Sequence, residues 1–256
     1  MDKNCSDHCQ NRKHLILMKT RLDVEMARRG MVNSRSQAEN YIRLSQVEVD
    51  GRPAGKPGQM VESGVDIRLL SAEQYVSRAG LKLASVAGIF GVDFRGKTVL
   101  DIGSSTGGFT DYALQHGAVK VIAVDVGTDQ LHPSLRGDHR IELHEKTDIR
   151  DFAADWPIDI IVCDVSFISL REILPHVARA LMSPGTELLA MLKPQFEAGK
   201  HQTNKGVIKN DKMRRQILAD FEQWSKWYFI ILDKRDSDVA GAKGNVERFY
   251  RLKIKH

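Results

Sequence analysis

The sequence predicts an α/β fold, with a largely parallel sheet covered by helices on both faces and a small α+β module before it. Three observations predict this. Beyond Ser77, apolar segments of strand length alternate with helical stretches, which is typical of a parallel sheet wrapped by helices. A glycine-rich turn follows the first of these segments. Residues 14–70 instead show two short segments with helical spacing, followed by small alternating ones.

Residues 1–13 are polar, and we expect them to form a flexible tail. Four metal-ligand residue types occur in and just after this tail: Cys5, His8, Cys9 and His14. The spacing of the first pair is not that of a usual zinc finger. No metal is therefore predicted.

Residues 14–70 are expected to fold as one module. Apolar residues at helical spacing predict a helix over about 22–27 and a second over 35–44. Ser34 precedes the second segment and can cap it. Alternating residues predict a strand at 47–49, with further small strands after it.

Residues 71–76 are expected to be a linker, and residues 77–256 a second domain. Five apolar segments in that domain predict strands at 98–103, 121–126, 141–146, 160–164 and 186–192. A helix is predicted at 211–225, and two further strands follow it, at 227–233 and 247–254.

The most informative motif is the glycine-rich turn after the strand at 98–103, where open α/β sheets bind nucleotide-like ligands. Its candidate cofactor-binding residues are Asp101, Gly103, Ser104, Ser105, Thr106, Gly107, Gly108 and Phe109. The motif is neither a dinucleotide fingerprint nor a P-loop, because it lacks G-x-G-x-x-G and the G-K-[ST] ending.

Two further carboxylates follow the next two predicted strands. Asp125 can accept hydrogen bonds from ribose hydroxyls, and Asp148 can accept one from an adenine amino group. An aspartate at a strand end can also simply cap the next helix. Three carboxylates in register at successive strand ends nevertheless predict an adenosine-bearing ligand. The constellation resembles the seven-stranded, Rossmann-like methyltransferases, which implies S-adenosyl-L-methionine as the cofactor.

Asp164 and Lys193 end the fourth and fifth predicted strands, so we expect them beside the transferred methyl group. A solvated surface lysine is the alternative for Lys193, although Pro194 fixes the chain there. For Lys82, in a helix predicted over 78–90, a polar position on the outer helix face competes. A ribose 2′-hydroxyl holds its proton tightly, and a lysine whose pKa is lowered by a neighbouring cation can remove it.

Two resemblances make this reading specific. The set Lys82, Asp164, Lys193 and Glu247 resembles the Lys-Asp-Lys-Glu tetrad of the FtsJ-like ribose 2′-O-methyltransferases. The N-terminal residues Arg21-Leu22-Asp23, Ser34-Arg35, Ala38 and 47–51 resemble the S4 RNA-binding modules. The S4 resemblance implies that RNA phosphates contact Arg21, Arg35 and Arg43, while Ser45 departs from the glycine usual at that turn.

From about residue 14 the whole chain resembles the TlyA family, known both as hemolysin A and as ribosomal RNA methyltransferases. The resemblance implies methylation of cytidine riboses in 16S or 23S ribosomal RNA, with ribosomal RNA and subunits as partners. The linker lacks the Arg and Trp present there in some relatives, reading Glu73-Gln74-Tyr75-Val76.

The composition fits this reading. Lys and Arg outnumber Asp and Glu by 38 to 33, a net charge of +5 that suits a polyanionic partner. Seven Lys/Arg fall between Lys193 and Arg215. The three cysteines form no disulfide framework, and no apolar run is long enough for a membrane span, so we expect a cytoplasmic protein.

Three other functions compete with the methyltransferase. A non-catalytic ribosome-binding protein would not need the lysine and carboxylate positions. A membrane-lytic hemolysin would need an amphipathic stretch that the sequence lacks. A pseudouridine synthase, which also follows S4 modules, would not need the glycine-rich turn.

Overall fold

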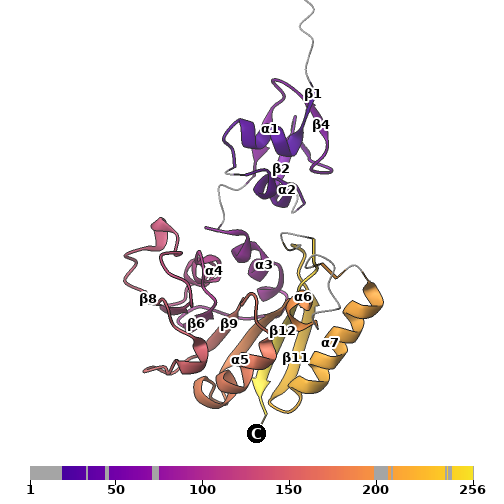
Figure 1. Cartoon of the computed structure of the whole chain (residues 1–256). Coiled ribbons are helices and arrows are strands. Elements are labelled where there is room, and N and C mark those ends of the chain that lie inside the picture. Colours follow the sequence, from indigo (N-terminus) through magenta and orange to yellow (C-terminus); the bar gives the residue numbers. More distant parts are fainter. Residues whose placement is uncertain are drawn as a thin grey trace, which may run out of the picture. The chain divides into compact units, whose positions relative to one another are not determined.

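The computed structural model describes residues 19–32, 34–43, 46–70, 75–198, 207–208, 210–239, 241 and 244–255. The chain divides into two compact units, Met1–Leu70 and Ser71–His256, and each is described by itself (Figure 1). The predictions made for Cys5, His8, Cys9, His14 and Ser45 lie outside the described residues.

The first unit has two helices and two small antiparallel sheets. Its elements are β1 (Lys19–Arg21), α1 (Leu22–Arg28), α2 (Arg35–Arg43), β2 (Val47–Val49), β3 (Arg52–Pro53), β4 (Met60–Glu62) and β5 (Ile67–Leu69). β1 pairs with β4, and β2 lies between β3 and β5. Both predicted helices and the strand at 47–49 are confirmed, and Ser34 Oγ accepts the backbone N–H of Gln37 at 3.2 Å.

A single apolar cluster holds this unit together. Leu22 and Met26 of α1 are fully buried, as is Val47 of β2, and Tyr41 of α2 is nearly so. The two helices meet through these side chains, so the helical spacing that predicts them also forms the core of the module.

The second unit is built on one seven-stranded sheet. Its elements are α3 (Arg78–Ala87), β6 (Thr98–Ile102), α4 (Gly108–Gln115), β7 (Lys120–Val124), β8 (Ile141–His144), β9 (Ile160–Cys163), α5 (Leu170–His176), β10 (Glu187–Leu192), α6 (Pro194–Glu197), α7 (Asp211–Ser225), β11 (Phe229–Asp236) and β12 (Arg248–Ile254). The strand order is β11-β12-β10-β9-β6-β7-β8, and β12 runs antiparallel to both of its neighbours. The predicted seven-stranded α/β domain is confirmed.

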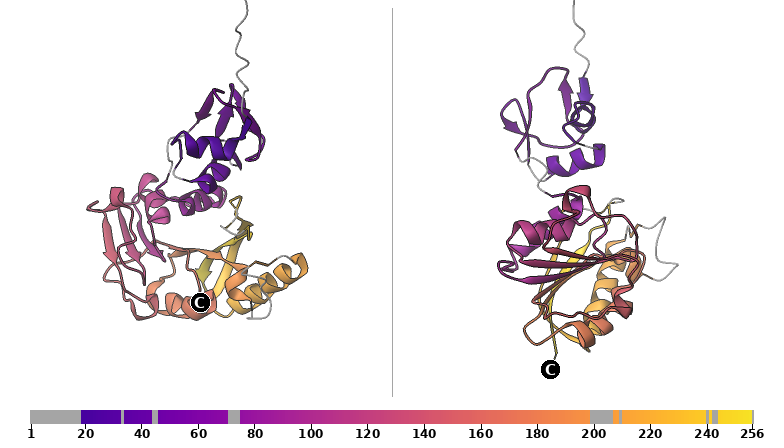
Figure 2. Two further views of the ribbon diagram at one scale, coloured as in Figure 1. Left: turned by 45° about the horizontal axis from the view of Figure 1, so that its top comes forward. Right: turned by 90° about the vertical axis from the view of Figure 1, so that its left-hand side faces the viewer.

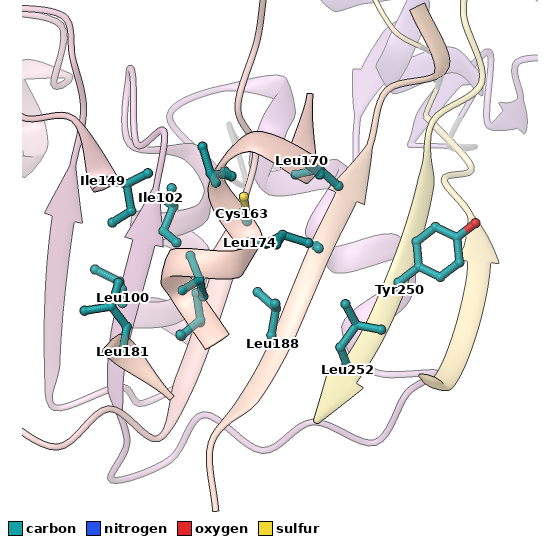
Figure 3. Packing of buried hydrophobic residues seen from close by; sticks show 14 of the residues in the cluster. Leu100, Ile102, Ile149, Cys163, Leu170, Leu174, Leu181, Leu188, Tyr250 and Leu252 are labelled. Atoms are coloured by element: carbon teal, nitrogen blue, oxygen red, sulfur yellow. The ribbon is translucent and has the colours of Figure 1, made fainter. Parts of the chain in front are cut away.

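Helices cover both faces of this sheet (Figure 2). Successive residues of a strand point to opposite faces. Phe249 of β12 lies 6.1 Å from the ring of Phe109 in α4, and the next residue, Tyr250, lies 5.0 Å from Phe221 in α7. α4 and α7 therefore pack on opposite faces. Figure 3 shows the apolar cluster to which Tyr250 belongs, where Leu174 of α5 packs over the strands.

The last two residues of the predicted linker, 71–76, belong to the second unit. Tyr75 is 4 % exposed and its ring lies 5.4 Å from that of Tyr112. The backbone N–H of Val76 donates to the carboxylate of Asp111 at 2.7 Å. Residues 71–74 lie outside the described part of the chain.

Candidate active site

A crevice opens where β6 and β9 lie side by side. From β6 the strand order continues to β7, toward one edge of the sheet, and from β9 it continues to β10, toward the opposite edge. The carboxyl ends of β6 and β9 therefore flank a topological switch point. A cavity of about 410 Å³ lies there. Its lining includes the predicted residues Gly103, Ser105, Asp125, Asp148 and Asp164.

The glycine-rich turn fits tightly between neighbouring elements. Gly103 has a φ of +79°, and a Cβ there would lie 2.9 Å from the carbonyl oxygen of Asp164. Gly108, at the start of α4, lies against α3, because a Cβ on it would lie 2.9 Å from the backbone nitrogen of Gly80. Only glycine allows these approaches. They bring the turn, the end of β9 and the first turn of α3 together.

Two of the three carboxylates predicted to bind the cofactor, Asp125 and Asp148, line the 410 Å³ cavity. Asp125 accepts the backbone N–H groups of Ser105 at 2.8 Å and Gly127 at 2.6 Å. Asp148 accepts from the Arg150 guanidinium at 2.6 and 3.0 Å, and these hydrogen bonds lower its pKa to about 2. Asp148 also caps the short 3₁₀ helix after it, which is the structural role that an aspartate at a strand end can have without any ligand. Each carboxylate can still accept from a ligand, because Oδ2 of Asp148 accepts one hydrogen bond and each oxygen of Asp125 accepts one.

Asp101 is fully buried at the end of β6. One carboxylate oxygen accepts the Thr110 hydroxyl at 2.7 Å, and the other has no hydrogen-bond partner among the described residues. Burial, against the lowering effect of the Thr110 hydrogen bond and with the help of the nearby Asp164 carboxylate, raises the pKa of Asp101 to about 7. A buried carboxylate without a counter-charge is costly, so this site suits a ligand that brings a cationic group.

Asp101 lines a second cavity of about 130 Å³, together with Ala79, Phe109 and Lys193. This chamber shares four lining residues with the larger cavity: Gly103, Ser105, Asp164 and Ser166. The two cavities therefore adjoin, with Asp164 at their junction. The Ser104 hydroxyl also lines the small chamber, and it too is buried without a partner among the described residues.

The four predicted catalytic residues form two ion pairs. Lys193 Nζ lies 2.5 Å from Asp164 Oδ1 and donates to Ser166 Oγ at 2.7 Å. Lys82 Nζ lies 2.5 Å from Glu247 Oε2. Lys82 is 8 % exposed and Lys193 is 9 % exposed. Lys193 is therefore not a solvated surface lysine, and Lys82 does not lie on a solvent-facing side of its helix.

The two pairs are linked through α3. Ala79, three residues before Lys82 and therefore on the same helix face, lines the small chamber that also contains Asp164 and Lys193. Such an arrangement can hold and move a proton at the end of the larger cavity.

Two residues at this site had no role in the sequence analysis. Ser166 accepts the Lys193 hydrogen bond, and a serine three residues after a strand carries no signal of its own. Phe167 is 91 % exposed, has a φ of +68° and lies 5.2 Å, ring to ring, from Phe196. A bulky residue in this backbone region is unusual, and its exposed ring can stack on a nucleobase.

In the first unit, Arg21 and Arg35 both contact the buried carboxylate of Asp23. The side chain of Arg43 lies outside the described part of the chain, as do Lys200, Lys205 and Lys209 of the predicted basic run. Of that run, Arg214 pairs with Asp236 at 2.7 Å. In the described ranges, no helix is both long and apolar enough to cross a membrane.

The fold and the site define a Rossmann-like methyltransferase domain that follows a small RNA-binding module. Comparison with known families agrees: residues 75–253 match the FtsJ-like methyltransferase family, and residues 20–67 match the S4 domain.

Individual relatives are similar over most of the chain. A 23S rRNA (cytidine-2′-O)-methyltransferase TlyA from Campylobacter jejuni is 42 % identical over 75 % of this chain and 75 % of its own. A 16S/23S rRNA (cytidine-2′-O)-methyltransferase TlyA from Mycobacterium tuberculosis is 36 % identical over 92 % of this chain and 90 % of its own.

A solved structure named as a hemolysin, from Streptococcus thermophilus, is 34 % identical over 93 % of this chain and 90 % of its own, with a TM-score of 0.69. The chain belongs to the TlyA family of FtsJ-like methyltransferases. The resemblance drawn from the sequence is confirmed.

Proposed function

We propose that this protein transfers a methyl group from S-adenosyl-L-methionine to the ribose 2′-hydroxyl of a cytidine in 16S or 23S ribosomal RNA. The observation that carries the proposal is the buried pair of Lys193 and Asp164 at the junction of two cavities. The names of the C. jejuni and M. tuberculosis relatives support the choice of substrate.

The larger cavity fits the adenosine part of the cofactor. We assign Asp125 to the ribose hydroxyls and Asp148 to the adenine amino group, because both line this cavity. The orphaned oxygen of Asp101 and the hydroxyl of Ser104 suit the cationic and polar amino-acid end. When bound, the cofactor supplies a methyl group on a sulfonium centre, which is already activated toward a nucleophile.

Lys193 is the proposed base. The ammonium first gives up its proton to solvent; the neutral Nζ then accepts the proton of the 2′-hydroxyl as the ribose oxygen takes the methyl group, and the ion pair with Asp164 at 2.5 Å and the hydrogen bond to Ser166 at 2.7 Å are restored. The Lys82–Glu247 pair ties α3 to the residue directly before β12. We assign it the role of orienting the substrate and the first pair.

RNA affinity is assigned to the S4 unit. Arg21 and Arg35 keep side-chain exposures of 44 % and 56 % and can reach phosphate oxygens. Arg43 is proposed with them from the S4 resemblance alone. We infer a cytoplasmic location from ribosomal RNA as the proposed substrate.

A ribosome-binding protein without activity is the second candidate. Two nearly buried ion pairs argue against it, because the desolvation of their charges is costly. A protein that only binds RNA would not require these ion pairs.

The direct test incubates the purified protein with labelled cofactor and with ribosomal subunits from a strain that lacks the gene. We expect a ribose methylation, detected because it blocks alkaline cleavage of the adjoining phosphodiester. Transfer to a base, or no transfer to either subunit, would contradict the proposal.

A further inference from the structure

We infer that Asp23, in the S4 unit, is a positioning residue for RNA: its buried carboxylate fixes Arg21 and Arg35 as a two-guanidinium clamp for RNA phosphate. The inference rests on the proposed function, because it assumes that this unit binds ribosomal RNA. It assigns a role in RNA binding to an acidic residue, Asp23. Removal of this carboxylate should weaken RNA binding, whereas simple charge attraction predicts that it strengthens binding.

Asp23 is 0 % exposed, yet the side chains of Arg21 and Arg35 both reach solvent. Arg21 donates Nε to Oδ1 at 3.0 Å and Nη2 to Oδ2 at 2.8 Å. Arg35, from the start of α2, donates Nε to Oδ2 at 2.8 Å. Burial alone would raise the pKa of Asp23, but the hydrogen bonds from both arginines hold it at about 2. One ionised carboxylate therefore joins two arginines from different elements.

Both guanidinium groups keep donors for a ligand. A guanidinium has five N–H donors. Arg21 uses two of them on Asp23. Arg35 uses one on Asp23 and one on Glu39, at 3.4 Å. Each group therefore retains three donors, which suits the several acceptor oxygens of a phosphodiester backbone.

The backbone of the loop before β4 supports the same arrangement. The Arg21 guanidinium lies against Gly58, where a Cβ would approach Nη1 to 3.3 Å and Cζ to 3.5 Å. The backbone N–H of Asp23 donates to the carbonyl of Pro57 at 3.2 Å, which ties this loop to the start of α1. A larger side chain at position 58 would move the guanidinium without changing any charge.

The sign of the effect separates positioning from charge. RNA attracts cations, so removing a carboxylate next to the clamp should strengthen binding if only the field matters. If Asp23 positions the arginines, its removal weakens binding, because two long side chains then lose their fixed geometry before they meet phosphate.

The chain offers a matched control. Glu39 also contacts Arg35, but at the surface and at 3.4 Å, and Glu39→Gln makes the same charge change as Asp23→Asn. The affinity of the full chain for a ribosomal RNA fragment is measured at several salt concentrations. We expect Asp23→Asn to weaken binding at least fivefold, and Glu39→Gln to leave it unchanged or slightly tighter. Equal or tighter binding by Asp23→Asn would overturn the inference.

Asp23→Asn can also unfold the unit, so far-UV circular dichroism and thermal unfolding accompany each titration. If the unit unfolds, Gly58→Val decides, because its expected contact is with the flexible end of Arg21 and it leaves the charge unchanged. Weaker RNA binding by folded Gly58→Val supports the clamp, and wild-type affinity contradicts it. Failure of the proposed function would look different, since the wild-type chain itself would then neither bind nor methylate ribosomal RNA.

Discussion

Lys193 Nζ lies 2.5 Å from Asp164 Oδ1, although the two residues come from different strand–helix connections. The register of the sheet explains the contact. β9 and β10 are parallel, and Cys163 pairs with Ala190, so the residues that follow the two strands emerge at the same edge. The contact therefore follows from strand direction and register.

The first prediction concerns the adenosine end of the cofactor site. Asp125→Ala should weaken S-adenosyl-L-methionine binding by about 1–3 kcal/mol, the range for a lost charge-assisted hydrogen bond. Asp129→Asn is the control, because it removes a charge nearby from a side chain that is 77 % exposed. Calorimetry measures both. Unchanged affinity in Asp125→Ala would remove Asp125 from the site.

The second prediction concerns Asp101 and pH. Its pKa in the folded protein is about 7, against an ordinary value of 3.8, so between these values the unfolded chain binds fewer protons. The stability contribution of Asp101 therefore falls as pH rises from about 4 to 7. The substitution Asp101→Asn changes the unfolding free energy, and we compare that change at two pH values. It should be more stabilising at pH 8 than at pH 4 by more than about 1.4 kcal/mol, the equivalent of one pKa unit.

The same variant should bind S-adenosyl-L-methionine more weakly at pH 8, because the cationic end of the cofactor loses its counter-charge. Denaturant unfolding at both pH values, with and without cofactor, measures the two effects. An equal stability change at pH 4 and pH 8 would show that Asp101 does not titrate as described.

The third prediction separates stability from activity at the second ion pair. Lys82→Met leaves Glu247, which is 3 % exposed, without its partner, and should cost about 3–5 kcal/mol of unfolding free energy. Adding Glu247→Gln should recover most of that stability without restoring methyl transfer. Urea unfolding and a methylation assay check the pair of variants. Full activity in the double variant would show that this ion pair has only a structural role.

The fourth prediction concerns the division of labour between the units. A shortened chain that begins at Tyr75 keeps the contacts of Tyr75 with Tyr112 and of Val76 with Asp111. It should bind S-adenosyl-L-methionine as the full chain does and lose most methylation of ribosomal subunits. If it methylates them as efficiently, the S4 unit has a role other than substrate affinity.

Much of the fold could be predicted from the sequence, because the burial pattern of each element is local. α7 occupies Asp211–Ser225 as predicted, where Asn210 caps the helix. The seven strands lie close to their predicted ranges. Five of them, β6 to β10, are parallel, and buried parallel strands are short apolar runs. The antiparallel pairing of β1 with β4 was not foreseen, because strands of three residues leave almost no periodicity to detect.

The site could be predicted only in part. Asp164 and Lys193 end adjacent parallel strands, so their position follows from topology. The pairing of Lys82 with Glu247 needed the family resemblance, because it depends on how α3 packs near β12. The unpartnered oxygen of Asp101 and the Ser166 contact depend on side-chain packing, which no sequence pattern specifies.

The central claim is that Lys193 removes the proton from a ribose hydroxyl, and Lys193→Ala tests it most directly. RNA affinity and turnover are measured on the same preparation, together with thermal unfolding. We expect RNA affinity to change by no more than the loss of one phosphate contact would cause. Turnover should fall at least about a hundredfold, as is typical for the loss of a general base, and the residual product should still be a ribose methylation. Undiminished turnover in a folded Lys193→Ala protein, or a base-methylated product, would contradict the account.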